Sequence, residues 1–409
     1  MKGKIKILAL ASVLLPLLLM QSCSEKEPDP FADNLFLVSS DLEFMRTKEN
    51  MVTLLNYAAI LYPEVAELIP EVKSGVNIYS ITYNTTFMGE DVLASGLVMI
   101  PSVPGAYPVL SYQNGTNTLN ANAPSVDPDY QAYQFLQCVA STGYVVMLAD
   151  YLGFGVSDDM AHPYLHKEST VQTLVDMLYS LDEFDKDIAK DITLNDEYFL
   201  LGYSQGGWAT LALLDALEND YGSDFTVKAA SCGSGPYDLS YFNSYVLSLT
   251  EYPMPVFLGY ISNAYSEYDL YANPLSDLYN NPYDARIPGL YDGMHSSEQI
   301  NDQLILSIPA LFKAEYISGY STSATYQGVR DALSANSIQG WHSSVPLLFL
   351  HGTADGYVFP VLSERMHDAM LDAGTSPLTC LYVPMQDLNH SEGVVPAGLA
   401  GLEFFKTYR

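Results

Sequence analysis

The pentapeptide Gly202-Tyr203-Ser204-Gln205-Gly206 constrains the fold of this chain more than any other segment. An apolar run of strand length, Tyr198 to Leu201, precedes it, and an amphipathic run from Trp208 to Leu217 follows it. A strand, Gly-x-Ser-x-Gly and a helix together predict a sharp turn, in which glycine fits where a side chain would clash. Such a turn presents the serine Oγ at a helix N-terminus, where backbone N–H groups stabilise negative charge. We therefore interpret Ser204 as a nucleophile rather than as part of a chance match in a loop.

Apolar runs of strand length alternate with amphipathic runs of helix length along most of the chain. Besides the strand before Ser204, we expect strands at 76–85, 92–103, 107–112, 144–150, 227–231, 345–351 and 378–383. Besides the helix after Ser204, we expect helices at 41–61, 131–142, 168–184, 359–373 and 395–408. The first two strands alternate like an antiparallel pair, and the later pattern predicts a mostly parallel sheet with helices on both faces, an α/β fold.

The alternation breaks between residues 237 and 340, which lack strong strand patterns and hold fourteen of the 32 tyrosines. We interpret this segment as a mainly helical cap inserted between two parts of one core, 41–236 and 341–409. Its tyrosines either line a substrate groove, where they would contact acyl chains or stack on sugar or phenolic rings, or form the core of the cap itself.

The N-terminus has the features of an export signal. Residues 1–22 combine a basic start (Lys2, Lys4 and Lys6) with an apolar run, which predicts a signal peptide. Cys23 after Ser22 resembles a bacterial lipoprotein cleavage site, so we expect a lipidated Cys23 and a tether over 23–40. The acidic residues that follow Cys23 resemble the surface-export signal of Bacteroidetes lipoproteins. This resemblance implies an outer-membrane lipoprotein at the cell surface of a Gram-negative bacterium.

The net charge of the chain restricts the molecules that it can bind. The chain carries 48 acidic against 17 basic residues, a formal net charge of −31. A field of that sign repels nucleic acid and anionic lipid, so we expect membrane contact only through the lipid anchor.

Three cysteines remain after Cys23, and all lie in apolar surroundings: Cys138, Cys232 and Cys380. Their odd number and surroundings favour buried free thiols and leave one internal disulfide open. We see no zinc or calcium spacing, and predict no metal and no cofactor.

A serine hydroxyl needs a histidine base and an orienting carboxylate to act as a nucleophile. The turn resembles that of α/β-hydrolases, in which the acid and then the histidine follow the serine along the chain. His390 is our candidate base, because it lies in a loop just past the last strand. The other four histidines after Ser204 lie in or beside the cap, in a strand before the acid or in mid-helix: His295, His342, His351 and His367.

The candidate acid is Asp355, which follows the apolar strand 345–351 at the sheet edge where sites form. Asp387 is the alternative, only three residues before His390. For the oxyanion hole we expect the backbone N–H groups of Gln205 and Thr116, with Gly115 as the alternative second donor. An ordinary Asn-Gly turn is the other interpretation of the segment around Gly115.

Several segments resemble the secretory-lipase family of α/β-hydrolases, which includes bacterial secreted esterases and the fungal lipase A type. They occur in the family's order, within a resemblance that spans about residues 70–409: Asn114-Gly115-Thr116, Asp150-Tyr151-Leu152-Gly153-Phe154-Gly155, His162-Pro163-Tyr164-Leu165, Gly202 to Gly207 and His351 to Asp355. The resemblance implies an α/β-hydrolase fold, a cap between the sixth and seventh strands and a triad of Ser204, Asp355 and His390. Asn114 departs from the histidine that relatives often have, and we interpret 162–164 as shaping the loop beside the pocket.

We therefore expect a serine hydrolase that cleaves carboxylic esters through an acyl-enzyme, as an esterase or a lipase. Its substrate would be a small-molecule or glycan-borne ester. Two enzymatic alternatives stay open, a glycan-directed acetyl or feruloyl esterase and a serine peptidase of the same fold. A non-enzymatic surface binding lipoprotein would lack at least one triad member, and all three are present.

Overall fold

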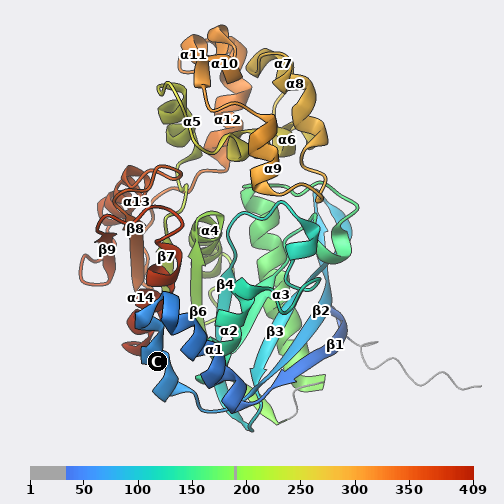
Figure 1. The fold of residues 1–409 in the computed structure, drawn as a ribbon, viewed down its shortest axis with the longest axis vertical. Coiled ribbons are helices and arrows are strands. Elements are labelled where there is room, and N and C mark those ends of the chain that lie inside the picture. The colour runs from blue at the N-terminus through green and yellow to red at the C-terminus, as the bar shows by residue number, and fades with distance from the viewer. Residues whose placement is uncertain (1–33, 188–190) are drawn as a thin grey trace, which may run out of the picture.

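A nine-stranded sheet forms the centre of the computed structural model, which describes residues 34–187 and 191–409 (Figure 1). The order across the sheet is β1-β2-β3-β5-β4-β6-β7-β8-β9. The bounds are β1 Leu37–Arg46, β2 Val76–Phe87, β3 Glu90–Pro101, β4 Gly105–Gln113, β5 Val145–Ala149, β6 Ile192–Tyr203, β7 Val227–Gly233, β8 Leu347–Gly352 and β9 Cys380–Met385. In this spatial order, the pairs β1–β2, β2–β3 and β3–β5 are antiparallel. The five remaining pairs, from β5–β4 to β8–β9, are parallel, which confirms the predicted mostly parallel sheet. The predicted signal peptide and Cys23 lie outside the described residues.

Helices cover both faces of the sheet (Figure 1). One face carries α3 (Lys167–Asp187), α4 (Gln205–Asn219) and α13 (Val361–Asp372), and the other carries α1 (Lys48–Leu61), α2 (Gln131–Ser141) and α14 (Val394–Lys406). Short 3₁₀ turns lie at Pro63–Glu71, Asn120–Asn122 and Gly155–Ser157. The apolar core on the α3–α4 face continues into the cap. Within the described ranges, no helix is both long enough and apolar enough to span a membrane.

Residues 41–61 do not form a single helix, which corrects the prediction from apolar spacing. The first part belongs to β1, which pairs antiparallel with β2, and α1 begins only at Lys48. Thr47 fixes this start, because its Oγ1 accepts the Asn50 N–H while the Asn50 side chain accepts the Thr47 N–H, both at 3.2 Å. Pairing with β2 thus overrides a helical pattern. β1 also contains residues 37–40, which the sequence had assigned to the tether.

The segment predicted as a cap folds mainly into short helices beyond the carboxyl ends of the parallel strands (Figure 1). These are α5 Leu239–Leu247, α6 Pro255–Glu267, α7 Leu275–Leu278, α8 Tyr283–Arg286, α9 Ser297–Gln303, α10 Ile308–Leu311, α11 Ala314–Gly319 and α12 Gln327–Ala335, with 3₁₀ turns at Ile287–Gly289 and Ala324–Tyr326. The cap lies between β7 and β8. It follows the seventh strand rather than the sixth, because β1 adds a strand that the sequence pattern did not indicate.

The three cysteines of the described residues are free and buried, in α2, β7 and β9. Burial raises the pKa of the Cys138 thiol to about 12 and that of Cys380 to about 11, and it raises the pKa of Cys232 well above the ordinary range. Thiols in this state hold little thiolate and react slowly with alkylating agents.

We expect a Cys23→Ser variant to resist iodoacetamide at pH 8 while folded and to take up three labels in denaturant. Intact-protein mass spectrometry counts the labels. Rapid modification of the native chain would contradict the burial of these thiols.

Candidate active site

Ser204 stands alone between the last residue of β6 and the first residue of α4. Its φ of 60° and ψ of −125° lie where residues other than glycine are rare, so the turn is strained. The neighbouring backbone holds this conformation. The Ser204 N–H donates to Gly233 O at the end of β7 (2.8 Å), and its carbonyl accepts the Trp208 N–H in α4 (3.2 Å). The turn therefore presents the side chain at the N-terminus of α4.

The glycines around Ser204 allow α4 to approach the sheet closely. A Cβ on Gly202 would lie 2.2 Å from Gly206 O, and a Cβ on Gly206 would lie 1.8 Å from Gln113 O at the end of β4. Both obstacles are backbone atoms, which cannot move aside as a flexible side chain can. This is the crowding that the sequence predicted for the Gly-x-Ser-x-Gly turn.

Gly206→Ala should therefore lower the free energy of unfolding by several kcal/mol, or prevent folding, because β4 and α4 must separate. Gly289→Ala is the matched control: no atom lies within 4 Å of its added Cβ, so we expect a change of about 0.5 kcal/mol or less. Urea unfolding of the two variants gives the comparison. Equal stability of both would show that the close approach at Gly206 is wrong.

The structure brings Ser204, His390 and Asp355 together from three segments. His390 Nε2 lies 2.9 Å from Ser204 Oγ, and His390 Nδ1 lies 2.6 Å from Asp355 Oδ2. Since the carboxylate only accepts, the Nδ1–H donates to it, and Nε2 is left to accept the serine hydroxyl proton. Each of the three residues is less than 9% exposed. The arrangement has the geometry of a nucleophile, a base and an orienting acid.

Asp355 is held as an ionised carboxylate. Its Oδ1 accepts the backbone N–H groups of Tyr357 (2.8 Å) and Val358 (3.0 Å). Burial alone raises the pKa of this carboxyl, but hydrogen bonds and charge from His351 and His390 outweigh burial and lower the pKa to about 2. At neutral pH, Asp355 therefore carries a full negative charge against the His390 ring.

The three predicted oxyanion donors belong to two segments that flank Ser204, the start of α4 and the loop after β4. The Gln205 N–H opens α4 and has no acceptor inside that helix. A Cβ on Gly115 would lie 3.7 Å from Ser204 Cβ, so the loop after β4 passes directly beside Ser204. Within residues 34–187 and 191–409, neither the Gly115 nor the Thr116 N–H donates to another protein group. These backbone N–H groups are available to donate to a substrate oxygen.

Side chains from the predicted 162–164 segment hold both halves of this corner. Gln205 Nε2–H donates to His162 Nε2 (3.1 Å), and His162 Nδ1–H donates to Leu152 O (2.7 Å). Burial lowers the pKa of His162 to about 4, so the ring is neutral and can accept from Gln205. On the other side, the Tyr164 hydroxyl bonds to Thr116 Oγ1 (2.7 Å). The segment shapes the loop, as predicted, and also fixes Gln205 and Thr116.

The rejected candidates lie elsewhere, with one exception. Asp387 is exposed, and His390 bonds to Asp355 instead. His295 bonds to Asp292 in the cap, and His367 bonds to its neighbour Asp368 in α13. His342, in the segment before β8, bonds to Gly374 O in the loop after α13. The exception is His351, whose Nε2 lies 3.2 Å from Asp355 Oδ2 although its place in a strand before the acid did not predict a contact. The spacing of four residues across the strand end was the available signal.

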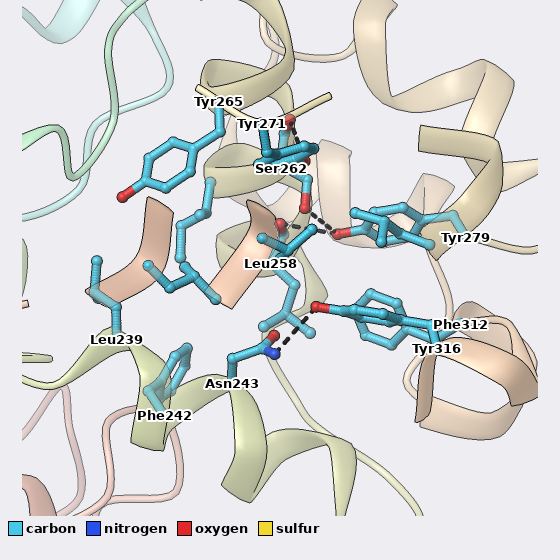
Figure 2. Close-up of a pocket in the computed structure, with 14 residues that line it drawn as sticks. Leu239, Phe242, Asn243, Leu258, Ser262, Tyr265, Tyr271, Tyr279, Phe312 and Tyr316 are labelled. Atoms are coloured by element: carbon cyan, nitrogen blue, oxygen red, sulfur yellow. Dashed lines mark hydrogen bonds between the residues drawn. The ribbon is translucent and has the colours of Figure 1, made fainter. Parts of the chain in front are cut away.

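The cap contains a small cavity whose lining comes from α5, α6, α7, α11, α12 and the segments joining them (Figure 2). Leucines and aromatic rings dominate the lining, and tyrosine hydroxyls bond to the cap's own groups: Tyr279 to Ser262 (2.7 Å) and Tyr316 to Asn243 (3.1 Å). Ser204, Asp355 and His390 are not among the lining residues. These tyrosines therefore build the core of the cap, one of the two roles left open by the sequence.

The cap contacts the loop that carries Gly115 and Thr116. Tyr260 OH donates to Asn117 O (3.2 Å), and the Asn120 N–H donates to Gly293 O (2.8 Å). Tyr260 also stacks on Tyr164, with ring centroids 4.3 Å apart. The position of the cap is thus tied directly to the loop beside Ser204.

The sheet order, the strained serine turn and the cap after β7 define an α/β-hydrolase fold, and comparison with solved structures confirms it. A Legionella pneumophila protein with a proposed hydrolase function is 24% identical, with a TM-score of 0.81 over 91% of this chain and 98% of that chain. The rice cell wall degrading esterase LipA from Xanthomonas oryzae is 22% identical, with a TM-score of 0.77 over 91% and 99%. Candida antarctica lipase A in its closed state is 16% identical, with a TM-score of 0.64 over 93% and 86%.

No protein-family model matches the sequence, and no curated protein matches it significantly. The structural likenesses above are too distant in sequence to show more than the fold. The fold that the secretory-lipase resemblance implied is therefore confirmed, and the activity rests on the site itself.

Proposed function

We propose that this protein is a serine hydrolase that cleaves carboxylic esters. One observation carries the proposal: an unbroken chain of hydrogen bonds runs from Ser204 Oγ through His390 to Asp355, at the N-terminus of α4. The esterase and the lipase among the similar structures support the same reaction class.

In the proposed reaction, Ser204 Oγ attacks the ester carbonyl carbon while His390 Nε2 takes the hydroxyl proton. Backbone N–H groups of Gln205 and Thr116 stabilise the negative carbonyl oxygen of the tetrahedral intermediate. His390 then gives the proton to the leaving alcohol, and an acyl group remains on Ser204. Water attacks this acyl-enzyme with His390 again as the base, which releases the acid and restores the serine. Asp355 keeps the Nδ1–H tautomer throughout.

A panel of nitrophenyl esters with a matching nitroanilide tests the reaction class. We expect burst kinetics and hydrolysis of the esters, and labelling of Ser204 by a fluorophosphonate probe. Preferential cleavage of the anilide would favour the peptidase alternative. Absence of both turnover and labelling in the folded protein would refute the proposal and favour a binding protein.

The alcohol part of the ester substrate distinguishes a glycan-directed esterase from a lipase. The similarity to a cell wall degrading esterase favours glycan-borne esters as one class to test, beside short-chain and long-chain acylglycerols. Acetylated xylan, feruloylated arabinose and triacylglycerols would be compared by acid release. Higher kcat/KM on the sugar esters would assign a glycan-directed esterase, and on triacylglycerols a lipase.

We further propose that the chain is exported and anchored through a lipidated Cys23. The basic start, the apolar run and the cysteine after Ser22 support this. Cells fed an alkyne fatty acid should label the wild-type protein in the membrane fraction, while Cys23→Ser should be unlabelled. Equal labelling of both would contradict the proposal.

A further inference from the structure

A second histidine shares the carboxylate of Asp355. His351 is the fifth residue of β8 and is fully buried. Its Nε2 lies 2.8 Å from Val358 O and 3.2 Å from Asp355 Oδ2. A carbonyl and an ionised carboxylate can only accept, so the proton of this ring must sit on Nε2.

The other ring nitrogen completes the assignment. His351 Nδ1 lies 2.7 Å from the buried Ser363 Oγ in α13. A neutral ring that carries its proton on Nε2 accepts the Ser363 hydroxyl proton at Nδ1, and every contact is then satisfied. The Nε2–H has Val358 O as its closer acceptor (2.8 Å), and Asp355 Oδ2 lies 3.2 Å from the same nitrogen. The series of polar contacts from Ser204 therefore continues past the acid, through His351 to Ser363.

The two carboxylate oxygens of Asp355 have different contacts: those of Oδ1 fix the orientation of the carboxylate, and those of Oδ2 act on its negative charge. Oδ1 is held by two backbone N–H groups, from Tyr357 and Val358, which fix the orientation of the carboxylate. Oδ2 is shared by two imidazoles, His390 at 2.6 Å and His351 at 3.2 Å. A donor on Oδ2 stabilises the negative charge there, and so weakens the pull of that charge on a protonated His390.

We propose that His351 is a positioning residue of the proposed ester hydrolysis. Its Nε2–H stabilises the negative charge on Asp355 Oδ2, which weakens the attraction of that carboxylate for a protonated His390. His351 thereby sets the lowest pH at which His390 can act as a base. This inference rests on the proposed function. His351 would then affect the pH dependence of activity, in addition to any contribution of its buried ring to stability.

Other titratable groups face this pair from neighbouring elements. The ring centroid of Tyr203, at the end of β6, lies 5.2 Å from that of His390, and the ring centroid of Tyr357 lies 5.4 Å from that of His390. Tyr252 in the cap is buried and donates to Tyr357 O (2.8 Å). Burial raises the pKa of Tyr203 and of Tyr252 above the ordinary range, so both stay neutral around His390. His351 is the imidazole that shares the acid with His390.

Two substitutions separate the N–H from the packing. His351→Phe keeps a ring and removes the donor, and His351→Gln places an amide N–H near the position of Nε2. We expect the acid limb of kcat/KM to move up by about one pH unit in H351F, because the untempered carboxylate holds the His390 proton more strongly. H351Q and the control His367→Phe should stay within a few tenths of a unit of wild type.

An active H351F with an unmoved or lowered acid limb would overturn the inference. An H351Q limb that moves as far as that of H351F would also overturn it, since the glutamine retains a donor.

A spectroscopic measurement on the unmutated full chain needs neither activity nor a folded variant. With ¹⁵N-labelled histidine at neutral pH, we expect His351 to carry its proton on Nε2, and its N–H signal to shift when His390 gains a proton. A proton on Nδ1, or a signal indifferent to His390, would contradict the inference. Because this readout does not use an ester, its failure is distinguishable from failure of the proposed hydrolysis.

Discussion

Ser204→Ala should abolish nearly all ester hydrolysis, with kcat reduced roughly 10⁴- to 10⁶-fold. The substitution removes the attacking oxygen, the hydroxyl that lies 2.9 Å from His390 Nε2. Residual activity would come only from the oxyanion donors and from substrate binding. Hydrolysis of a nitrophenyl ester by purified wild type and variant, at equal concentration, measures the loss.

The fold of S204A should be unchanged, because the turn is held by the Ser204 backbone rather than by its side chain. Relief of the strained φ is not expected either, since alanine also carries a Cβ. Ser234→Ala is a matched control, a buried serine whose hydroxyl bonds to Tyr203 and not to His390. Loss of activity in S234A comparable to that in S204A, or retained activity in S204A, would contradict the assigned nucleophile.

Asp355→Asn should lower kcat by about 10⁴-fold while leaving the packing intact. An amide is nearly the same size as the carboxylate, but its NH₂ group can donate to His390 Nδ1. The imidazole would then carry its proton on Nε2, where it can no longer accept the Ser204 proton. Stopped-flow measurement of the acylation burst should show the loss in the first chemical step. A loss of less than tenfold would show that another group orients His390.

The same variant gives a pH dependence of stability. The pKa of Asp355 is about 2 in the folded protein, below its ordinary value of 3.8, so its ionised form favours folding. This contribution, on the order of 2 kcal/mol, is present above pH 4 and is lost as the pH falls towards 2. The difference in free energy of unfolding between wild type and D355N should therefore narrow from pH 5 to pH 2. A constant difference would contradict the lowered pKa.

The sequence was sufficient to predict the residues that meet at the site, because their order along the chain is a property of the fold. Ser204 could be found from its glycines, and Asp355 from its place after an apolar strand. His390 then followed as the last histidine, in a loop past the final strand. Each inference needed only local pattern and the parallel sheet that the alternation predicted.

Other features depend on contacts that local pattern does not contain. The spacing of apolar residues over 41–61 favours a helix, but pairing with β2 makes the first part a strand. The contact between His351 and Asp355 depends on the turn that folds Asp355 back onto β8. The cap consists of short helices without a long amphipathic period, so its internal arrangement follows from aromatic packing between distant segments rather than from helical spacing.

Trapping the acyl-enzyme tests the proposed triad most directly. The protein would be mixed with nitrophenyl acetate, quenched in acid within milliseconds and digested for peptide mass spectrometry. We expect one acetyl group on the peptide that contains Ser204, formed in a burst of one equivalent and absent from D355N on the same timescale. Steady hydrolysis with no burst, or an acetyl group on a different residue, would contradict the claim that Ser204, His390 and Asp355 form a catalytic triad.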